Sequence, residues 1–139
     1  MIRFFTAYVC TAAILFPLDL IWIGGIARNF YRDGLGPIMA ERPNIAVAVA
    51  FYVLYVVGLS LFVVVPALTE NAWKHAVLWG ALFGLFAYAT YDLTNLATLA
   101  QFPARIAIVD MAWGTFLSSV SCTAGFFIAR FVLARIGTE

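Results

Sequence analysis

The chain has 139 residues, of which 65% are hydrophobic and only 11% are charged, and its mean hydropathy is +0.99. Ordinary soluble domains carry roughly 25% charged residues, so this chain has too few charges to cover a water-facing surface, and lipid is its expected solvent. The formal net charge of +1 excludes the basic surface that nucleic-acid binding requires.

The first apolar run covers residues 4–27 and is bracketed by Arg3 and Arg28. A transmembrane helix needs about 20 apolar residues to cross about 30 Å of hydrocarbon, so this run is long enough. Signal-peptide cores are shorter, about 7–15 residues, and end at a small-residue cleavage site. Because this run is longer, contains Asp19 and lacks such a site, we expect a true transmembrane helix.

Residues 28–44 hold two glycines, two prolines and five charges, which predicts a loop. Within it, Phe30 and Tyr31 are expected to anchor at the lipid headgroups. The second span is predicted over 45–65, with Pro66 ending it. The only polar side chains in this span are Tyr52, Tyr55 and Ser60.

The third span is predicted over 75–99 and the fourth over 106–129, separated by a short turn that contains Pro103. The fold class is therefore an all-α integral membrane protein, a compact up-down bundle of four transmembrane helices forming a single membrane domain over 1–139. The eight Lys and Arg residues divide four to four between the two sides, so the positive-inside rule does not orient the chain.

Three carboxylates lie inside apolar segments: Asp19, Asp92 and Asp110. Each costs about 2.5–3.5 kcal/mol at a helix centre, so such residues usually face the bundle interior and carry function. Asp19 and Asp92 come near the ends of spans that run the same way, and Asp110 near the start of the returning span. At about 1.5 Å per residue, all three are expected in the same half of the bilayer.

Polar and aromatic residues accompany these carboxylates on the predicted helix faces. Tyr88, Asp92 and Asn95 share a face at i, i+4 and i+7 spacing, and Tyr91 starts an adjoining stripe. Trp22 lies one turn from Asp19, and Trp113 lies beside Asp110; Trp and Asn supply N–H donors to carboxylates. The candidate ligand-binding or proton-linked residues are Asp19, Trp22, Tyr88, Tyr91, Asp92, Asn95, Asp110 and Trp113.

The same residues have a structural interpretation, in which Asp and Asn join helices through interhelical hydrogen bonds averaging about 0.6 kcal/mol. Three carboxylates without an interior Lys or Arg favour a functional site, because Ser or Thr would join helices at lower cost. Cys10 and Cys122 show no metal or redox spacing, and no transition-metal or haem ligand set occurs. We expect no metal site and no cofactor, although a hard cation held by carboxylates and the Asn95 amide stays open.

Two segments, "FAYATYDLTNLATL" (86–99) and "VDMAWG" (109–114), resemble the signature segments of domain-of-unknown-function family 2177, small bacterial predicted membrane proteins. The stretches 17–36 and 51–59 resemble the same family, and the likeness covers nearly the whole chain. The resemblance implies a multi-pass protein of the bacterial inner membrane with four spans. It carries no activity, so Asp19, Tyr91, Asp92, Asn95, Asp110 and Trp113 are motif positions without assigned roles.

Three functions remain open from the sequence. The first is an intramembrane site that binds or transports a small amphiphilic or cationic ligand, with protons linked through Asp92 and Asp110; transport would require a homodimer. The second is a cofactor-free membrane enzyme, of the isomerase, hydratase or cyclase type, acting on a lipid-soluble substrate. The third is a non-catalytic subunit or assembly factor of a larger membrane complex. Whether the chain is an enzyme is not decided at this stage.

Overall fold

The computed structural model describes residues 1–36 and 38–137 of the chain, and most of them are helical. Two short π-helical turns, η1 and η2, interrupt the α-helices. In chain order the elements are α1 (Ile2–Ile21), η1 (Trp22–Ile26), α2 (Arg28–Leu35), α3 (Ile45–Leu59), η2 (Ser60–Val64), α4 (Val65–Glu70), α5 (Trp73–Thr98) and α6 (Ala104–Arg135).

Four helices in the described part of the chain are long and apolar enough to cross a membrane. They are Ile2–Ile26, Ile45–Glu70, Trp73–Thr98 and Ala104–Arg135. The predicted spans fall on these four helices and differ only at their ends. The prediction of a four-span, all-α membrane bundle is confirmed.

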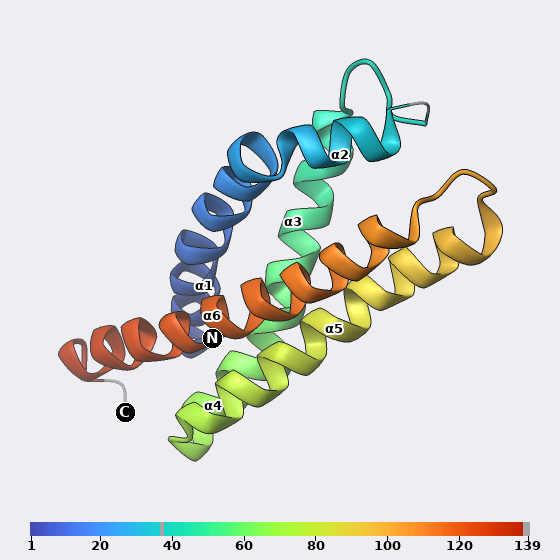
Figure 1. Cartoon of the computed structure of the whole chain (residues 1–139). Helices are drawn as coiled ribbons and strands as arrows, with labels where there is room; N and C mark the ends of the chain where they lie inside the picture. The colour runs from blue at the N-terminus through green and yellow to red at the C-terminus, as the bar shows by residue number, and fades with distance from the viewer. Residues whose placement is uncertain (37, 138–139) are drawn as a thin grey trace.

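The closest helix pair is the antiparallel hairpin of α5 and α6, which lie side by side along their length (Figure 1). Glycine permits this approach: a Cβ on Gly84 would lie 2.1 Å from the carbonyl oxygen of Gly114. A Cβ on Gly80 would likewise lie 3.0 Å from the carbonyl oxygen of Ser118. Small residues at four-residue spacing allow membrane helices to pack backbone against backbone, so these positions set the spacing of the hairpin.

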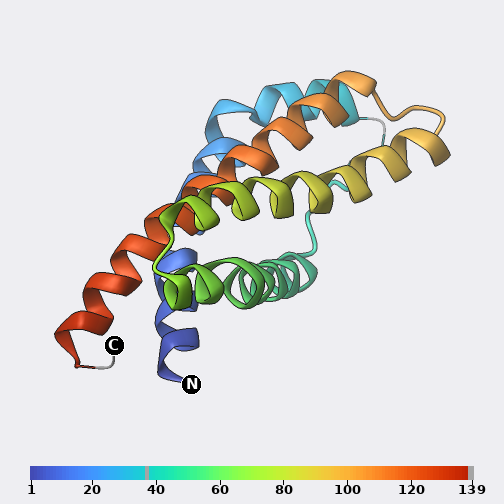
Figure 2. The same cartoon turned by 90° about the horizontal axis from the view of Figure 1, so that it is seen from below.

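The remaining helices pack around this hairpin less evenly. α1 packs extensively on α6, where a Cβ on Gly125 would lie 2.5 Å from Oγ1 of Thr11. The second span meets α5 and α6 mainly through η2 and α4, in its C-terminal half, and meets α1 along all three segments. Figure 2 shows the first half of α3 standing apart from α5, so the bundle is tighter at the η2 level than at the level where α3 begins.

The second span does not end at Pro66, contrary to the prediction. The helix continues through α4 to Glu70. Proline is tolerated in the first turn of a helical segment, where its missing N–H has no required partner. Pro66 falls in such a first turn, directly after the π-helical turn η2, so the chain remains helical across it.

The segment predicted as a loop, 28–44, begins with the helix α2. Phe30 and Tyr31 do not simply anchor at the headgroups: both pack against a small core formed by Phe102, Ile106 and Ala107 at the start of α6. Burial of aromatic surface against α6 stabilises this helix. Figure 1 shows α2 leading away from the end of α1 beside the start of α6.

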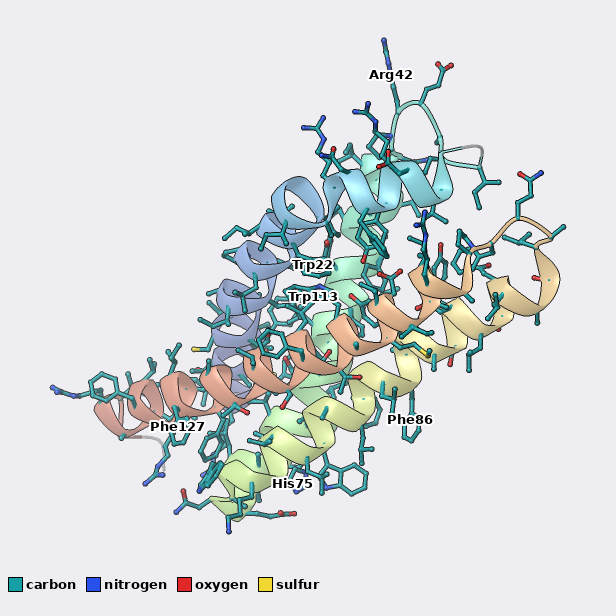
Figure 3. All side chains as sticks on the ribbon, in the orientation of Figure 1. Trp22, Arg42, His75, Phe86, Trp113 and Phe127 are labelled. Carbon is teal, nitrogen blue, oxygen red and sulfur yellow. The ribbon has the colours of Figure 1, made fainter. Side chains whose placement is uncertain are left out.

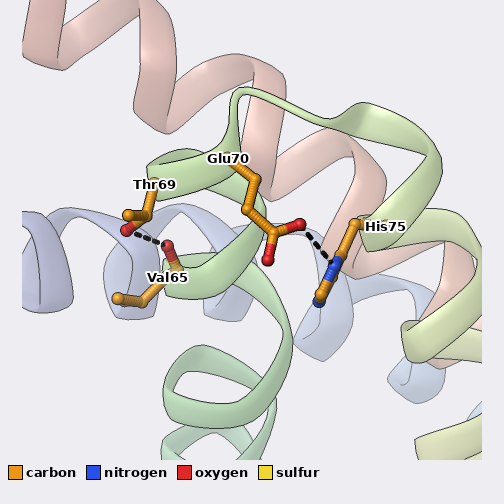
Figure 4. A network of polar contacts seen from close by, with 4 residues as sticks. All are labelled: Val65, Thr69, Glu70 and His75. Atoms are coloured by element: carbon orange, nitrogen blue, oxygen red, sulfur yellow. Dashed lines mark hydrogen bonds and ion pairs between the residues drawn. The ribbon is translucent and has the colours of Figure 1, made fainter.

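At the other end of the bundle, His75 pairs with Glu70 across the turn between α4 and α5. The distance from Nδ1 of His75 to Oε2 of Glu70 is 3.0 Å, and Thr69 donates to the carbonyl oxygen of Val65 at 3.0 Å (Figure 4). The contact joins the C-terminal turn of α4 to the first turn of α5, so it orders the link between the second and third spans.

Candidate ligand-binding site

Two adjoining cavities lie in the half of the bundle nearest α2. The outer cavity, of about 550 Å³, borders α2 and the following segment and includes Arg28, Arg32 and Glu41. The inner cavity, of about 370 Å³, lies between α3 and α5 and includes Phe51 and Tyr91. Both are lined by the same four residues: Asp19, Ile23, Tyr88 and Asp110. The two hollows therefore meet at a pair of carboxylates.

The three carboxylates lie at similar distances along their helices from the ends of the candidate spans. Asp19 lies seven residues before the first span ends at Ile26, and Asp92 lies six before Thr98. Asp110 lies six residues after the fourth span begins. At about 1.5 Å per residue, all three are roughly 9–11 Å inside the same end of the bundle.

Asp19 is held by donors from two other helices. Its side chain is only 2% exposed. Oδ2 accepts the hydroxyl proton of Tyr52 on α3 at 2.5 Å, and Oδ1 accepts the indole N–H of Trp113 on α6 at 2.8 Å. Each carboxylate oxygen can accept a further hydrogen bond, so Asp19 still has acceptor capacity toward the cavities.

Asp110 belongs to a second chain of hydrogen bonds that begins at Trp22. The indole N–H of Trp22 donates to the hydroxyl of Tyr31 at 3.1 Å, and that hydroxyl donates to Oδ1 of Asp110. Burial, and then the bond to Asp110, raise the pKa of Tyr31 above its ordinary value. Tyr31 therefore keeps its proton at physiological pH and serves as a donor.

The two chains of hydrogen bonds meet through a pair of stacked indoles. The rings of Trp22 and Trp113 are 4.3 Å apart between centroids and 8° from parallel, and they lie between α1 and α6 (Figure 3). The network thus runs from Tyr52 through Asp19 and the indole pair to Tyr31 and Asp110. It joins residues of α1, η1, α2, α3 and α6.

Of the four predicted site residues on α5, two line a cavity and two do not. The ring of Tyr88 lies directly over Gly114, where a Cβ would be 2.2 Å from Cδ2 of the tyrosine, and it lines both cavities. Tyr91 lines the inner cavity and is 60% exposed at its mouth. Asp92 is fully buried, and neither Asp92 nor Asn95 lines either cavity.

A family model described as "Predicted membrane protein (DUF2177)" matches residues 4–127 of the chain. The chain belongs to this family. Neither a curated protein nor a solved structure matches the chain. Within this DUF2177 chain, the structure brings Asp19, Trp22, Tyr88, Tyr91, Asp110 and Trp113 to the two cavities, and it leaves Asp92 and Asn95 outside them.

Sequence reasoning missed three tyrosines of this DUF2177 site. Tyr31 and Tyr52 donate to the carboxylates, and Tyr55 lines the inner cavity. The hydroxyl of Tyr55 lies 2.7 Å from Oγ of Ser118. Since Ser118 donates its own proton to the carbonyl oxygen of Gly114, Tyr55 is the donor. The available signal was the rarity of polar groups in the second span, where only Tyr52, Tyr55 and Ser60 occur.

Among the residues that the structure describes, no group of three His, Cys, Asp or Glu side chains lies close enough to hold a metal ion. The chemical capacity of the cavities lies instead in carboxylate acceptors, tyrosine donors and aromatic faces. Such a set attracts a cation through the carboxylates and through the π-faces of the rings. The apolar inner cavity adds space for a hydrocarbon chain.

Proposed function

We propose that this DUF2177 protein binds a small amphiphilic cation within the membrane, with the cationic headgroup between Asp19 and Asp110 and the apolar part in the inner cavity. The observation that carries the proposal is that two cavities of different polarity meet at these carboxylates. One cavity reaches the polar segment after α2, and the other opens between α3 and α5. A molecule with one charged and one apolar end matches that arrangement.

The surroundings of the carboxylates support a cationic headgroup over an anionic one. Two ionisable acids and the stacked indoles border the place where the cavities meet, and burial strengthens the attraction between opposite charges. Arg28 and Arg32 lie farther out, on α2, in the same outer cavity as Glu41. At that level they are placed to contact lipid headgroups rather than the bound cation.

The proposal extends to the setting of the protein. We infer a multi-pass protein of the bacterial inner membrane that works as one membrane domain. If the ligand is transported, a second copy would have to complete the path, because four spans are too few to enclose a wide aqueous route. Proteoliposome flux measured with and without a cross-linked dimer would separate binding from transport.

The direct test is calorimetric titration of the purified protein in lipid nanodiscs with three amphiphiles of equal alkyl length, carrying a trimethylammonium, a sulfonate or an uncharged headgroup. The ammonium compound is expected to bind saturably. Asp19→Asn and Asp110→Asn are each expected to weaken this binding at least tenfold, which is about 1.4 kcal/mol. Asp33→Asn, an exposed carboxylate on α2 outside both cavities, is the matched control.

Equal binding of the sulfonate, or unchanged affinity in both cavity variants, would overturn the proposal. Mass spectrometry of the same mixture tests the alternative that the protein is an enzyme, because it detects any chemical change in the ligand. A chemically altered ligand would indicate that the tyrosine–carboxylate pairs act as acid and base.

A further inference from the structure

Asp92 has an unusual environment for a carboxylate. Its side chain is 0% exposed, and neither of its oxygens has a hydrogen-bond partner among the described donors. An ionised carboxylate without donors in an apolar interior is strongly unfavourable, so something must neutralise this group.

The register of the α5–α6 hairpin places Asp92 opposite Asp110. The ring of Tyr88 lies over Gly114, which fixes the antiparallel alignment of the two helices at that point. One turn further along α5 is Asp92, and one turn back along α6 is Asp110. This alignment brings the buried, unpartnered side chain of Asp92 to the level of Asp110 on the facing helix.

Two ionised carboxylates cannot bond to each other, because both are acceptors only. A single proton turns one of them into a donor and relieves the repulsion, as in carboxylate pairs generally. Asp110 already accepts from Tyr31, which favours its ionised form. Asp92 has no other donor, so the proton belongs on Asp92.

We propose that Asp92 is a proton-binding site, which holds one proton at neutral pH in a hydrogen bond to Asp110 and gives it up when a cationic headgroup binds at Asp110. The second half of this statement rests on the proposed function. On release, the O–H bond of Asp92 breaks, the electron pair stays on its carboxylate, and the proton passes along the hydrogen bond to Asp110, which lines the outer cavity, and from there to water. Cation and proton then exchange one for one, and the net charge of the pocket is conserved.

Other titratable and charged groups line the two cavities that Asp110 borders. They are Asp19 on α1, Arg28, Tyr31 and Arg32 on α2, Glu41 in the segment after α2, Tyr52 and Tyr55 on α3, and Tyr88 and Tyr91 on α5. The tyrosines are neutral donors at neutral pH. Asp19 adds negative charge near Asp110, which further favours retention of the proton in the unliganded protein.

The proton itself is measured first, without any ligand. Infrared spectroscopy of the protein in nanodiscs at neutral pH is expected to show the carbonyl stretch of a protonated carboxylic acid. The band should disappear in Asp92→Asn and remain in Asp33→Asn. Asp92→Asn should fold, because an amide N–H replaces the proton as donor to Asp110. Absence of the band in the wild type, or its full retention in Asp92→Asn, would overturn the inference.

The exchange is measured second, with the alkyl-trimethylammonium compound in a weakly buffered solution that contains a pH indicator. Wild-type protein is expected to release about one proton per ligand bound, and Asp92→Asn none. Binding without proton release in the wild type would contradict the exchange. If the compound fails to bind while the infrared band depends on Asp92, the proposed function fails and the proton site stands, so the two failures are distinguishable.

Discussion

At the scale of single residues, the site depends on hydroxyl donors whose loss leaves a buried acceptor unpaired. Tyr31 bridges Trp22 and Asp110 and also packs against the start of α6. A hydrogen bond to a charged group contributes roughly 1.5–3 kcal/mol. One hydroxyl thus connects the position of α2 to the carboxylate of the proposed ligand site.

Tyr31→Phe is expected to keep the aromatic packing and lose the bond to Asp110. Hydrogen exchange should then be faster over residues 28–35, and thermal stability should fall. The raised pKa of Tyr31 means that its contribution is full below about pH 10, the ordinary tyrosine value, and is lost as the pH rises above it. Tyr8→Phe, for which no side-chain hydrogen bond is seen in the described structure, serves as the control, and equal exchange in both variants would contradict the prediction.

A pair of serines on α6 tests the same principle deeper in the bundle. Ser118 accepts from the buried hydroxyl of Tyr55, so Ser118→Ala is expected to lower the free energy of unfolding by about 1–3 kcal/mol. Ser121 is equally buried but its hydroxyl has no partner among the described atoms. Ser121→Ala should therefore be neutral or stabilising. Chemical unfolding in detergent measures both, and the reverse order would refute this assignment of donors.

At the scale of elements, the α5–α6 hairpin positions Tyr88, Asp92 and Asp110 relative to one another. The position of Asp92 opposite Asp110 depends on how closely the two helices approach at Gly84 and Gly114. A close backbone contact cannot yield without separating the helices, whereas a flexible side chain can move aside. The small residues of this hairpin therefore determine the geometry of the site as well as the stability of the pair.

Gly84→Ala is expected to destabilise the hairpin by roughly 1–3 kcal/mol, since its Cβ would lie 2.1 Å from a carbonyl oxygen. Gly24→Ala is the matched control, because nothing lies within 4 Å of a Cβ there. Thermal unfolding of the two variants should differ clearly, with Gly24→Ala at or above the wild type. Similar melting temperatures would show that the helices separate more easily than the structure indicates.

At the scale of the whole molecule, the bundle is open on one side at the level of the carboxylates. The first half of α3 stands apart from α5 (Figure 2), and Phe51 and Tyr91, at the inner cavity between them, are 47% and 60% exposed. In a membrane this surface faces lipid. For the proposed amphiphilic ligand, this opening predicts entry sideways from the bilayer, without first crossing to the aqueous side.

Ala48→Phe tests lateral entry, because Ala48 lines the inner cavity on α3. The larger side chain should reduce the affinity for a long-chain alkyl-trimethylammonium compound at least tenfold, while changing that for tetramethylammonium less than twofold. Ala50→Phe, on an exposed face of the same helix, is the control. Equal losses for both ligands would place the alkyl chain elsewhere.

The amino-acid sequence by itself determined the class of the protein and its four spans, and it predicts a shared depth for the three carboxylates. These properties follow from apolar run length and from rise per residue, which are local quantities. The predicted ends of two segments were wrong. The second span continues past Pro66, which lies directly after a π-helical turn. The polar 28–44 segment begins with a helix because Phe30 and Tyr31 pack against an apolar surface on α6.

Only the tertiary structure decided which polar residues act together. Residue spacing predicts Tyr88, Asp92 and Asn95 on one helix face, yet of these only Tyr88 lines the cavities. The distance between two helices depends on glycine contacts between them, and the spacing within one helix does not report such contacts. Tyr31 and Tyr52 joined Asp110 and Asp19 across large sequence separations. A periodic pattern shows which residues share a face, but the packing of several helices determines which neighbour that face meets.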